Sequence, residues 1–175
     1  MARIKLITAE TAAPDVEKIF QEIQKAFGMV PNLFRTYAHH PPLLEANWHK
    51  VKRVMMEGKL SRKTKEAIAL LVSQDNNCKY CVAAHTGALK AIDVSADEIN
   101  LIATDLDQAD FSAKERALIR FARSANRAAN DVTDADITAV RDTGADDAEI
   151  IEALGVMEVF AAFNRFLDAL DVELG

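Results

Sequence analysis

Two cysteines, Cys78 and Cys81, lie three residues apart, and His85 follows four residues later. Residues at i, i+3 and i+4 share one face of an α-helix, so a helix here would align the three side chains. Cysteines so placed can approach the Cα separation of roughly 4.4–6.8 Å that a disulfide needs. If Asn76 or Asn77 caps this helix, Cys78 falls in the first turn, where the helix dipole favours a thiolate. His85, one turn after Cys81, can take a thiol proton or hold the resulting anion.

Glu66 is the second candidate for chemistry, because it immediately precedes a run of its helix, residues 67–72, that is entirely apolar. A helix that is apolar all round is usually buried. A buried carboxylate needs a partner, or its pKa rises until the group is neutral. Beside His85, Glu66 would form a proton relay of the kind used in general acid–base catalysis. The alternatives are a surface ion pair of Glu66 with Arg62 or Lys63, and a purely structural, hydrogen-bonded His85.

A zinc site is the main competing interpretation of the cysteine pair. Structural zinc takes four ligands, and only His85 follows the pair at a suitable spacing. No second CxxC or histidine pair completes a tetrahedral set, so the pattern favours thiol chemistry. His39 and His40 precede two prolines and are expected to be cap or surface residues. Trp48 is expected in the core.

Composition limits the remaining function classes. The 175 residues fit one domain, with 50% hydrophobic, 27% charged and 6% aromatic residues. Few aromatics and abundant alanine and leucine favour helices over strands. The net charge of −6 argues against binding nucleic acid or an anionic membrane through bulk charge.

The first residues of the chain do not resemble a targeting signal. Only the apolar pair Leu6 and Ile7 follows the charges at Arg3 and Lys5, which is too short for a secretory signal. No stretch approaches the roughly 18 apolar residues of a membrane span. We therefore expect a cytoplasmic protein. In that reducing compartment structural disulfides are rare, so two cysteines three residues apart indicate a catalytic or metal-binding role.

The hydrophobic periodicity is helical along the whole chain, and no segment alternates convincingly as a strand. The pattern predicts a single all-α domain over 1–175, with no linker that would divide it. The expected helices are Pro14–Phe27, Asn32–Ala38, Leu43–Met56, a helix capped by Ser61 and ending near Asp75, one from the cysteines to Ile92, Ser95–Asp105, one opened by the capping box 112–115 and ending near Ala129, one from Thr133 to Gly144, and Asp147–Leu170.

Taken together, Glu66, Cys78, Cys81 and His85 resemble the E-x11-CxxC-xxx-H signature of the alkylhydroperoxidase D-like proteins. These proteins belong to the carboxymuconolactone decarboxylase superfamily. Residues 28–34 (GMVPNLF) and 163–166 (FNRF) are similar to peroxidase-related members, so the resemblance covers most of the chain. Four chemically distinctive residues at fixed spacing make this more specific than a bare CxxC.

The resemblance implies an all-α homo-oligomer, a trimer or hexamer, that reduces small hydroperoxides through thiols and without a bound cofactor. By this analogy Cys81 is the peroxidatic thiolate and becomes a sulfenic acid, and Cys78 resolves it to a redox-active disulfide. Glu66 with His85 relays the proton. An external dithiol, a lipoyl protein or a thioredoxin-like donor, then reduces the Cys78–Cys81 disulfide.

Tyr80 is the one departure from the signature, because the best-understood members have a histidine between the cysteines. A phenol can contact the relay as a hydrogen-bond donor, but its pKa of about 10 makes it a poor base. The same site could therefore serve a thiol–disulfide oxidoreductase or a redox sensor. A lactone decarboxylase would need no thiols, which counts against that function, and a helical module that only binds a partner is the remaining alternative.

Overall fold

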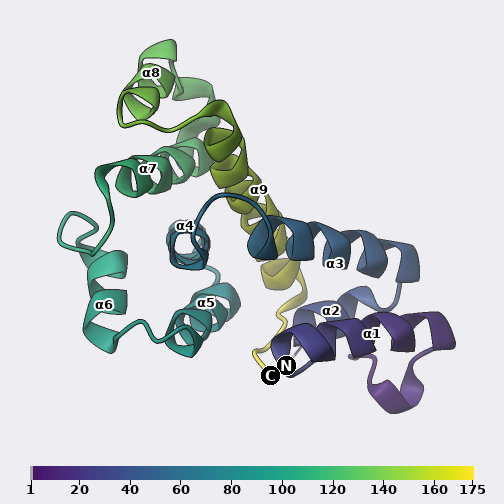
Figure 1. Ribbon diagram of the computed structural model, residues 1–175. Helices are drawn as coiled ribbons and strands as arrows, with labels where there is room; N and C mark the ends of the chain where they lie inside the picture. Colours follow the sequence, from purple (N-terminus) through teal and green to yellow (C-terminus); the bar gives the residue numbers. More distant parts are fainter. Residues whose placement is uncertain (1) are drawn as a thin grey trace.

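The computed structural model describes residues 2–175, which form helices and no strands, as the sequence predicts (Figure 1). None of these helices is both long and apolar enough to cross a membrane. The α-helices of this range are α1 (Pro14–Phe27), α2 (Asn32–Tyr37), α3 (Pro41–Met56), α4 (Arg62–Asp75), α5 (Lys79–Ala91), α6 (Ala96–Thr104), α7 (Ala113–Ala128), α8 (Asp134–Asp142) and α9 (Asp147–Leu170), with short 3₁₀ turns at Ala9–Thr11 and Ala129–Asp131.

Helix α4 lies at the centre of the molecule, where Figure 1 views it end-on among α3, α5, α6, α7 and α9. Every residue from Thr64 to Ser73 is buried, as the apolar run 67–72 predicts. Because α4 is shielded on all sides, any polar side chain that it carries needs a partner inside the protein.

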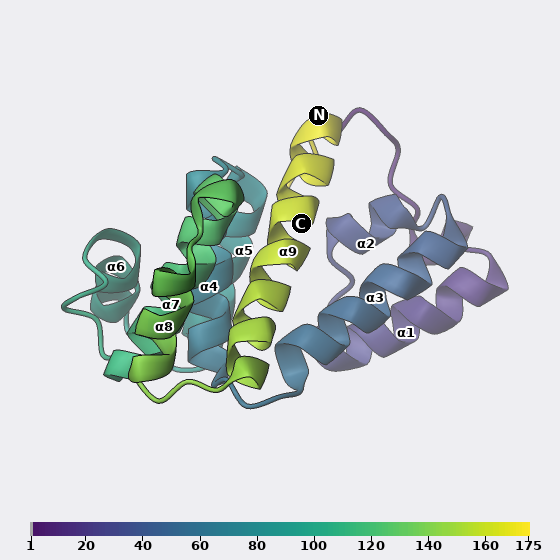
Figure 2. The same cartoon turned by 90° about the horizontal axis from the view of Figure 1, so that it is seen from above.

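Helix α9 runs along α4 and α7, and its other side meets α3. Figure 2 shows it passing between α4–α8 and the group α1–α3. In that N-terminal group Trp48 is 1% exposed and packs edge-on against Phe27 and Phe34, with ring centroids 5.5 and 5.7 Å away. The prediction that Trp48 belongs to the core is confirmed.

Helix α3 begins two residues earlier than the expected Leu43. Pro41 and Pro42 occupy its first turn, where the missing N–H is not needed and the fixed φ suits a helix. His40 is the N-cap, and its Nδ1 accepts the backbone N–H of Leu43 at 3.3 Å. The expectation of a cap or surface role for His40 is therefore confirmed.

The turn between α4 and α5 corrects a second expectation. Neither asparagine caps α5: Asn76 is the C-cap of α4, and Asn77 follows with a left-handed φ of 59°. Asparagine tolerates that conformation better than most residues, which lets the chain reverse in two residues. The N-cap of α5 is Cys78 itself, so Cys78 lies at the threshold of the helix instead of within its first turn.

The loop from α3 to α4 is held by Glu152 of α9. Its carboxylate accepts the backbone N–H of Lys59 at 2.8 Å and pairs with the buried Lys65 at 2.6 Å. Gly58 has a φ of 105°, and a Cβ there would collide with the Glu152 carboxylate. These contacts fix the start of α4.

Candidate active site

The two thiols lie together, buried, at the beginning of α5. Cys78 is 0% and Cys81 3% exposed, and both are free. The backbone N–H of Cys78 donates to the carbonyl of Ser73 at 2.9 Å, which ties this end of α5 to α4. A sulfur at a helix N-terminus faces unpaired backbone N–H groups and the positive end of the helix dipole, so the fold favours a thiolate here.

A hydrogen bond between the two sulfurs shifts their pKa values in opposite directions. The bond from Cys81 lowers the pKa of Cys78, against burial and the nearby Asp168 carboxylate, which raise it. The same bond raises the pKa of Cys81, and burial adds to the effect, while hydrogen bonds from Asn164 and Ser73 oppose it. The two shifts have opposite directions, so Cys78 is the more acidic thiol of the pair.

Glu66 and His85 form a second buried pair. Glu66 is 1% exposed, and its Oε2 lies 2.6 Å from Nδ1 of His85. Burial raises the pKa of Glu66, but His85 and then Arg62 act against it and hold the pKa below the ordinary glutamate value. A charged carboxylate on Nδ1 makes that nitrogen the donor, which leaves Nε2 as the basic atom of the ring.

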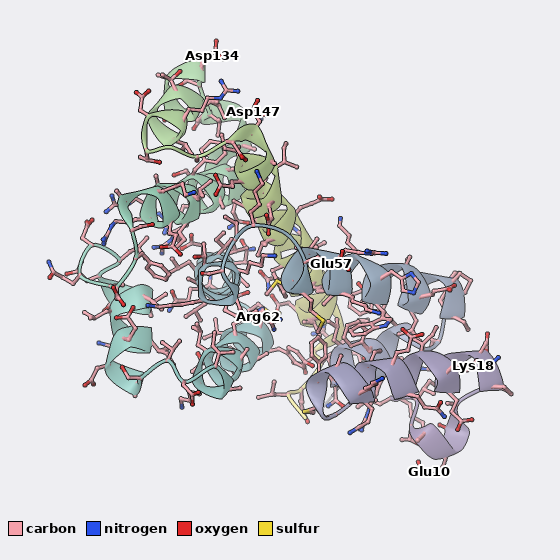
Figure 3. The ribbon with its side chains drawn as sticks, in the orientation of Figure 1. Glu10, Lys18, Glu57, Arg62, Asp134 and Asp147 are labelled. Atoms are coloured by element: carbon pink, nitrogen blue, oxygen red, sulfur yellow. The ribbon has the colours of Figure 1, made fainter. Side chains whose placement is uncertain are left out.

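Arg62 completes this pair, and Figure 3 labels it at the start of α4, near the middle of the molecule. Its Nε donates to Oε1 of Glu66 at 2.7 Å. The alternative ion pair of Glu66 with Arg62 thus exists and accompanies the His85 contact, with the carboxylate buried and the Arg62 side chain 35% exposed. The edge of Phe160 packs against the His85 ring, with centroids 4.2 Å apart.

The predicted residues thus form two pairs, the thiols and the Glu66–His85 carboxylate–imidazole. Within residues 2–175 no hydrogen bond joins His85 to either sulfur, although His85 lies one turn after Cys81. The Tyr80 hydroxyl points to α2 and accepts the backbone N–H of Leu33 at 3.2 Å. Burial raises the pKa of Tyr80, which makes it a still weaker acid.

Several polar residues of the site were missed from the sequence, namely Ser73 and Asn164 beside Cys81 and Asp168 beside Cys78. Asn164 carries a signal that could have identified it. It is 0% exposed and lies between Phe160, Phe163 and Leu167 on the apolar face of α9. A fully buried amide among aromatic and aliphatic neighbours must have specific partners.

No group of three or more histidine, cysteine, aspartate or glutamate side chains within the described part of the chain is placed to hold a metal ion. The two sulfurs lie at the beginning of α5, and Glu66 of α4 meets His85 one turn after Cys81.

The lowered pKa of Glu66 predicts how the stability of the fold depends on pH. The folded pKa lies below the unfolded value of about 4.3, so the stabilisation is complete above that value and is lost as the pH falls through the folded pKa. We expect Glu66→Gln to lower the free energy of unfolding by about 1–3 kcal/mol at pH 7. The difference from wild type should shrink toward pH 3 in urea titrations. A difference that stays constant from pH 7 to pH 3 would contradict a charged Glu66.

Comparison with known proteins shows which family this site is similar to. Residues 41–124 match the carboxymuconolactone decarboxylase family, and this span contains Glu66, both cysteines and His85. An alkyl hydroperoxide reductase of Mycobacterium tuberculosis is 30% identical over 88 residues, which are 50% of this chain and 26% of that protein. The matched part thus spans about a quarter of that relative.

Two solved structures share the fold over nearly the whole chain. The alkylhydroperoxidase AhpD core of a peroxidase-related protein from Ralstonia eutropha JMP134 is 26% identical, with a TM-score of 0.89 over 99% of this chain and 92% of that one. A debrominase in complex with tribromopyrrole has a TM-score of 0.85 over 100% and 94%, but at 18% identity it shows the fold alone. With its helical fold, its matched family segment and its cysteine pair, the chain is similar to the alkylhydroperoxidase D-like proteins of the carboxymuconolactone decarboxylase superfamily.

Proposed function

We propose that this protein reduces hydroperoxides with Cys78 and Cys81, using an external dithiol as the electron source. The observation that carries the proposal is the pair of free, hydrogen-bonded thiols at the N-terminus of α5, where the pKa of one sulfur is lowered by the other. Low-pKa thiols beside a second cysteine are the usual sites of reversible sulfur oxidation. The alkyl hydroperoxide reductase of M. tuberculosis supports the same chemistry.

The proposed cycle begins when the Cys81 thiolate attacks the terminal oxygen of the hydroperoxide. The O–O bond breaks, an alcohol leaves with one proton, and the sulfur becomes a sulfenic acid. Cys78 then attacks that sulfur, so that an S–S bond forms and water leaves. An external dithiol, such as a lipoyl protein or a thioredoxin-like donor, returns two electrons and two protons by thiol–disulfide exchange.

Cys81 is our candidate for the attacking sulfur because it lies one turn from His85 and faces polar groups of Ser73 and Asn164. Cys78 is the more acidic thiol, so attack by Cys81 requires that the proton of the Cys81 thiol is first transferred away from its sulfur. His85, with Nδ1 bound to Glu66, is the candidate to protonate the leaving oxygen.

The direct test is one equivalent of an organic hydroperoxide added to the fully reduced protein. We expect mass spectrometry after rapid alkylation to show two thiols lost per chain, a Cys78–Cys81 disulfide, and no bond between chains. The short spacing of the pair makes the intramolecular bond the favoured product. Recovery of both thiols unmodified, while the same peroxide oxidises a small-molecule thiol, would reject the proposal.

A second candidate is exchange with disulfides of other proteins, and Tyr80 is the observation that favours it. The Tyr80 hydroxyl is engaged with Leu33, so the thiols lack the additional base that the best-understood relatives have between their cysteines. Rate constants for an organic hydroperoxide and for a protein disulfide, measured on the same reduced sample, distinguish the two functions. The faster oxidant identifies the substrate class.

We also expect the protein to assemble into a homo-oligomer, a trimer or a hexamer. Large apolar side chains remain on the surface of the single chain, with Ile151 68%, Leu174 55% and Leu43 46% exposed. Association would bury part of this surface. Light scattering at micromolar concentration should return a multiple of 19.2 kDa. A mass equal to one chain contradicts the expectation.

A further inference from the structure

Four polar side chains form a connected network that runs from α7 to the sulfur of Cys81. Asn126 of α7 bonds to Asn76, Asn76 bonds to Asn164 of α9, and Asn164 bonds to Ser73 of α4. Asn164 and Ser73 are both 0% exposed. Since buried polar atoms need partners, such a network is costly to maintain unless each member is satisfied.

The orientation of the Asn164 amide follows from the bonds of Asn76. The Asn76 Nδ2 group donates to Oδ1 of Asn126 at 3.2 Å and to Oδ1 of Asn164 at 2.9 Å. Asn126 returns a bond from its own Nδ2 to Oδ1 of Asn76 at 3.2 Å. With both amides paired in this way, the oxygen of Asn164 faces Asn76, and its NH₂ group faces the other way.

One N–H of Asn164 and the O–H of Ser73 remain available to donate to the sulfur of Cys81. One N–H of Asn164 donates to Oγ of Ser73 at 3.1 Å, and the other is not used within the network. The Ser73 hydroxyl accepts that bond, so its own O–H proton remains free to donate. Both residues hydrogen-bond the side chain of Cys81. The backbone carbonyl of Ser73 also accepts the backbone N–H of Cys78, so Ser73 contacts both ends of the CxxC segment.

We propose that Ser73 and Asn164 are a fixed pair of hydrogen-bond donors that stabilises the thiolate of Cys81 and thereby sets its reactivity. A buried anion is tolerated only where donors replace the lost water. These two cannot turn away, because the remaining atoms of their polar groups are occupied by Asn76 and by each other. This inference rests on the proposed function only in treating Cys81 as the sulfur that reacts.

The two donors stabilise a thiolate at Cys81, whereas the other groups around this sulfur destabilise it. Cys78 and Tyr80 of α5 face Cys81, the Asp168 carboxylate of α9 faces Cys78, and the pair is buried. A negative charge on Cys78 or Asp168 and the loss of water all disfavour a thiolate at Cys81. Besides the helix terminus, the side chains of Ser73 and Asn164 are the neighbours that favour this thiolate.

The test measures alkylation of Cys81 by iodoacetamide against pH in the Cys78→Ser background, where Cys81 is the single thiol. Ser73→Ala and Asn164→Ala are each expected to raise the midpoint by about one pH unit, the effect of one hydrogen bond to a charged group. The plateau rate at high pH should not fall, because a thiolate of higher pKa is the stronger nucleophile. Thr64→Val is the matched control, since it removes a buried hydroxyl of α4 that bonds to Glu115 instead.

A midpoint that is unchanged in Ser73→Ala, or one that shifts equally in Thr64→Val, overturns the proposal. A plateau that falls without a midpoint shift shows a packing role and overturns it as well. If Asn164→Ala does not fold by circular dichroism, Ser73→Ala, which removes a single oxygen, decides alone. No peroxide is used, so shifted midpoints together with absent peroxidase activity would reject the proposed function and leave this inference standing.

Discussion

Cys81→Ser is expected to abolish hydroperoxide consumption, whereas Cys78→Ser should complete a single rapid turnover and then stop. Without the Cys81 sulfur no nucleophile lies next to the Ser73 and Asn164 donors. Without Cys78 the first step still occurs, but the sulfenic acid has no partner with which to form a disulfide. Stopped-flow consumption of an organic hydroperoxide gives the number of turnovers, and dimedone labelling with mass spectrometry locates the sulfenic acid.

The opposite outcome has a definite structural meaning. The hydrogen bond from Cys81 lowers the pKa of Cys78, so Cys78 is the more acidic of the two thiols. If the thiolate of Cys78 reacts first, Cys78→Ser will lose the first turnover and Cys81→Ser will retain it. The roles of the two cysteines are then exchanged. If both variants consume peroxide as wild type does, the site is not a peroxidase.

Much of the fold could be predicted from the sequence because its signals are local. The apolar run 67–72 implies a helix buried on all sides, and α4 is that helix. The capping box at Ser112 and Glu115 marks the start of α7, where the two residues exchange their hydrogen bonds as predicted. Propensity and capping act over a few residues, so they can be recognised without knowledge of the tertiary structure.

The start of α5 could not be predicted in the same way. Asn76 and Asn77 are strong capping residues by type, yet tertiary contacts give them other roles. Asn76 is held by Asn126 and Asn164, residues 50 and 88 positions away along the chain. Cys78 therefore occupies the N-cap position of α5, where the positive end of the helix dipole favours a thiolate. Long-range pairing of this kind has no local signal.

In the candidate site, too, the residues close together in sequence could be predicted, and those from distant helices could not. The spacing of the cysteines, His85 and Glu66 identified them as site residues from the sequence. The Glu66–His85 contact was expected because a buried carboxylate needs a partner. The groups that adjust the sulfurs come from other helices. Asn164 and Asp168 lie on α9, more than 80 residues after Cys81. A single sequence carries no information about which faces of α4, α5 and α9 meet.

The relay itself predicts the second large effect. Glu66→Gln and His85→Ala are each expected to slow the reaction with hydroperoxide by roughly 10²-fold, the lower range for loss of a general acid–base group. Glutamine keeps the size of Glu66 but not its charge, so it removes the negative charge that favours the proton on Nδ1 of His85 and stabilises the protonated ring. His85→Ala removes the proton carrier itself. Rapid-mixing kinetics with an organic hydroperoxide measure both variants.

Two comparisons give this prediction its specificity. Glu152→Gln is the control, because Glu152 also pairs with a buried cation of α4, Lys65, but has no hydrogen bond to Glu66 or His85 in the described chain. It should retain the wild-type rate. Diamide, an oxidant with no oxygen leaving group to protonate, should still form the Cys78–Cys81 disulfide in both relay variants at near the wild-type rate. If Glu66→Gln slows diamide and hydroperoxide alike, the carboxylate acts by positioning the thiols, and the relay has no part in protonating the leaving oxygen.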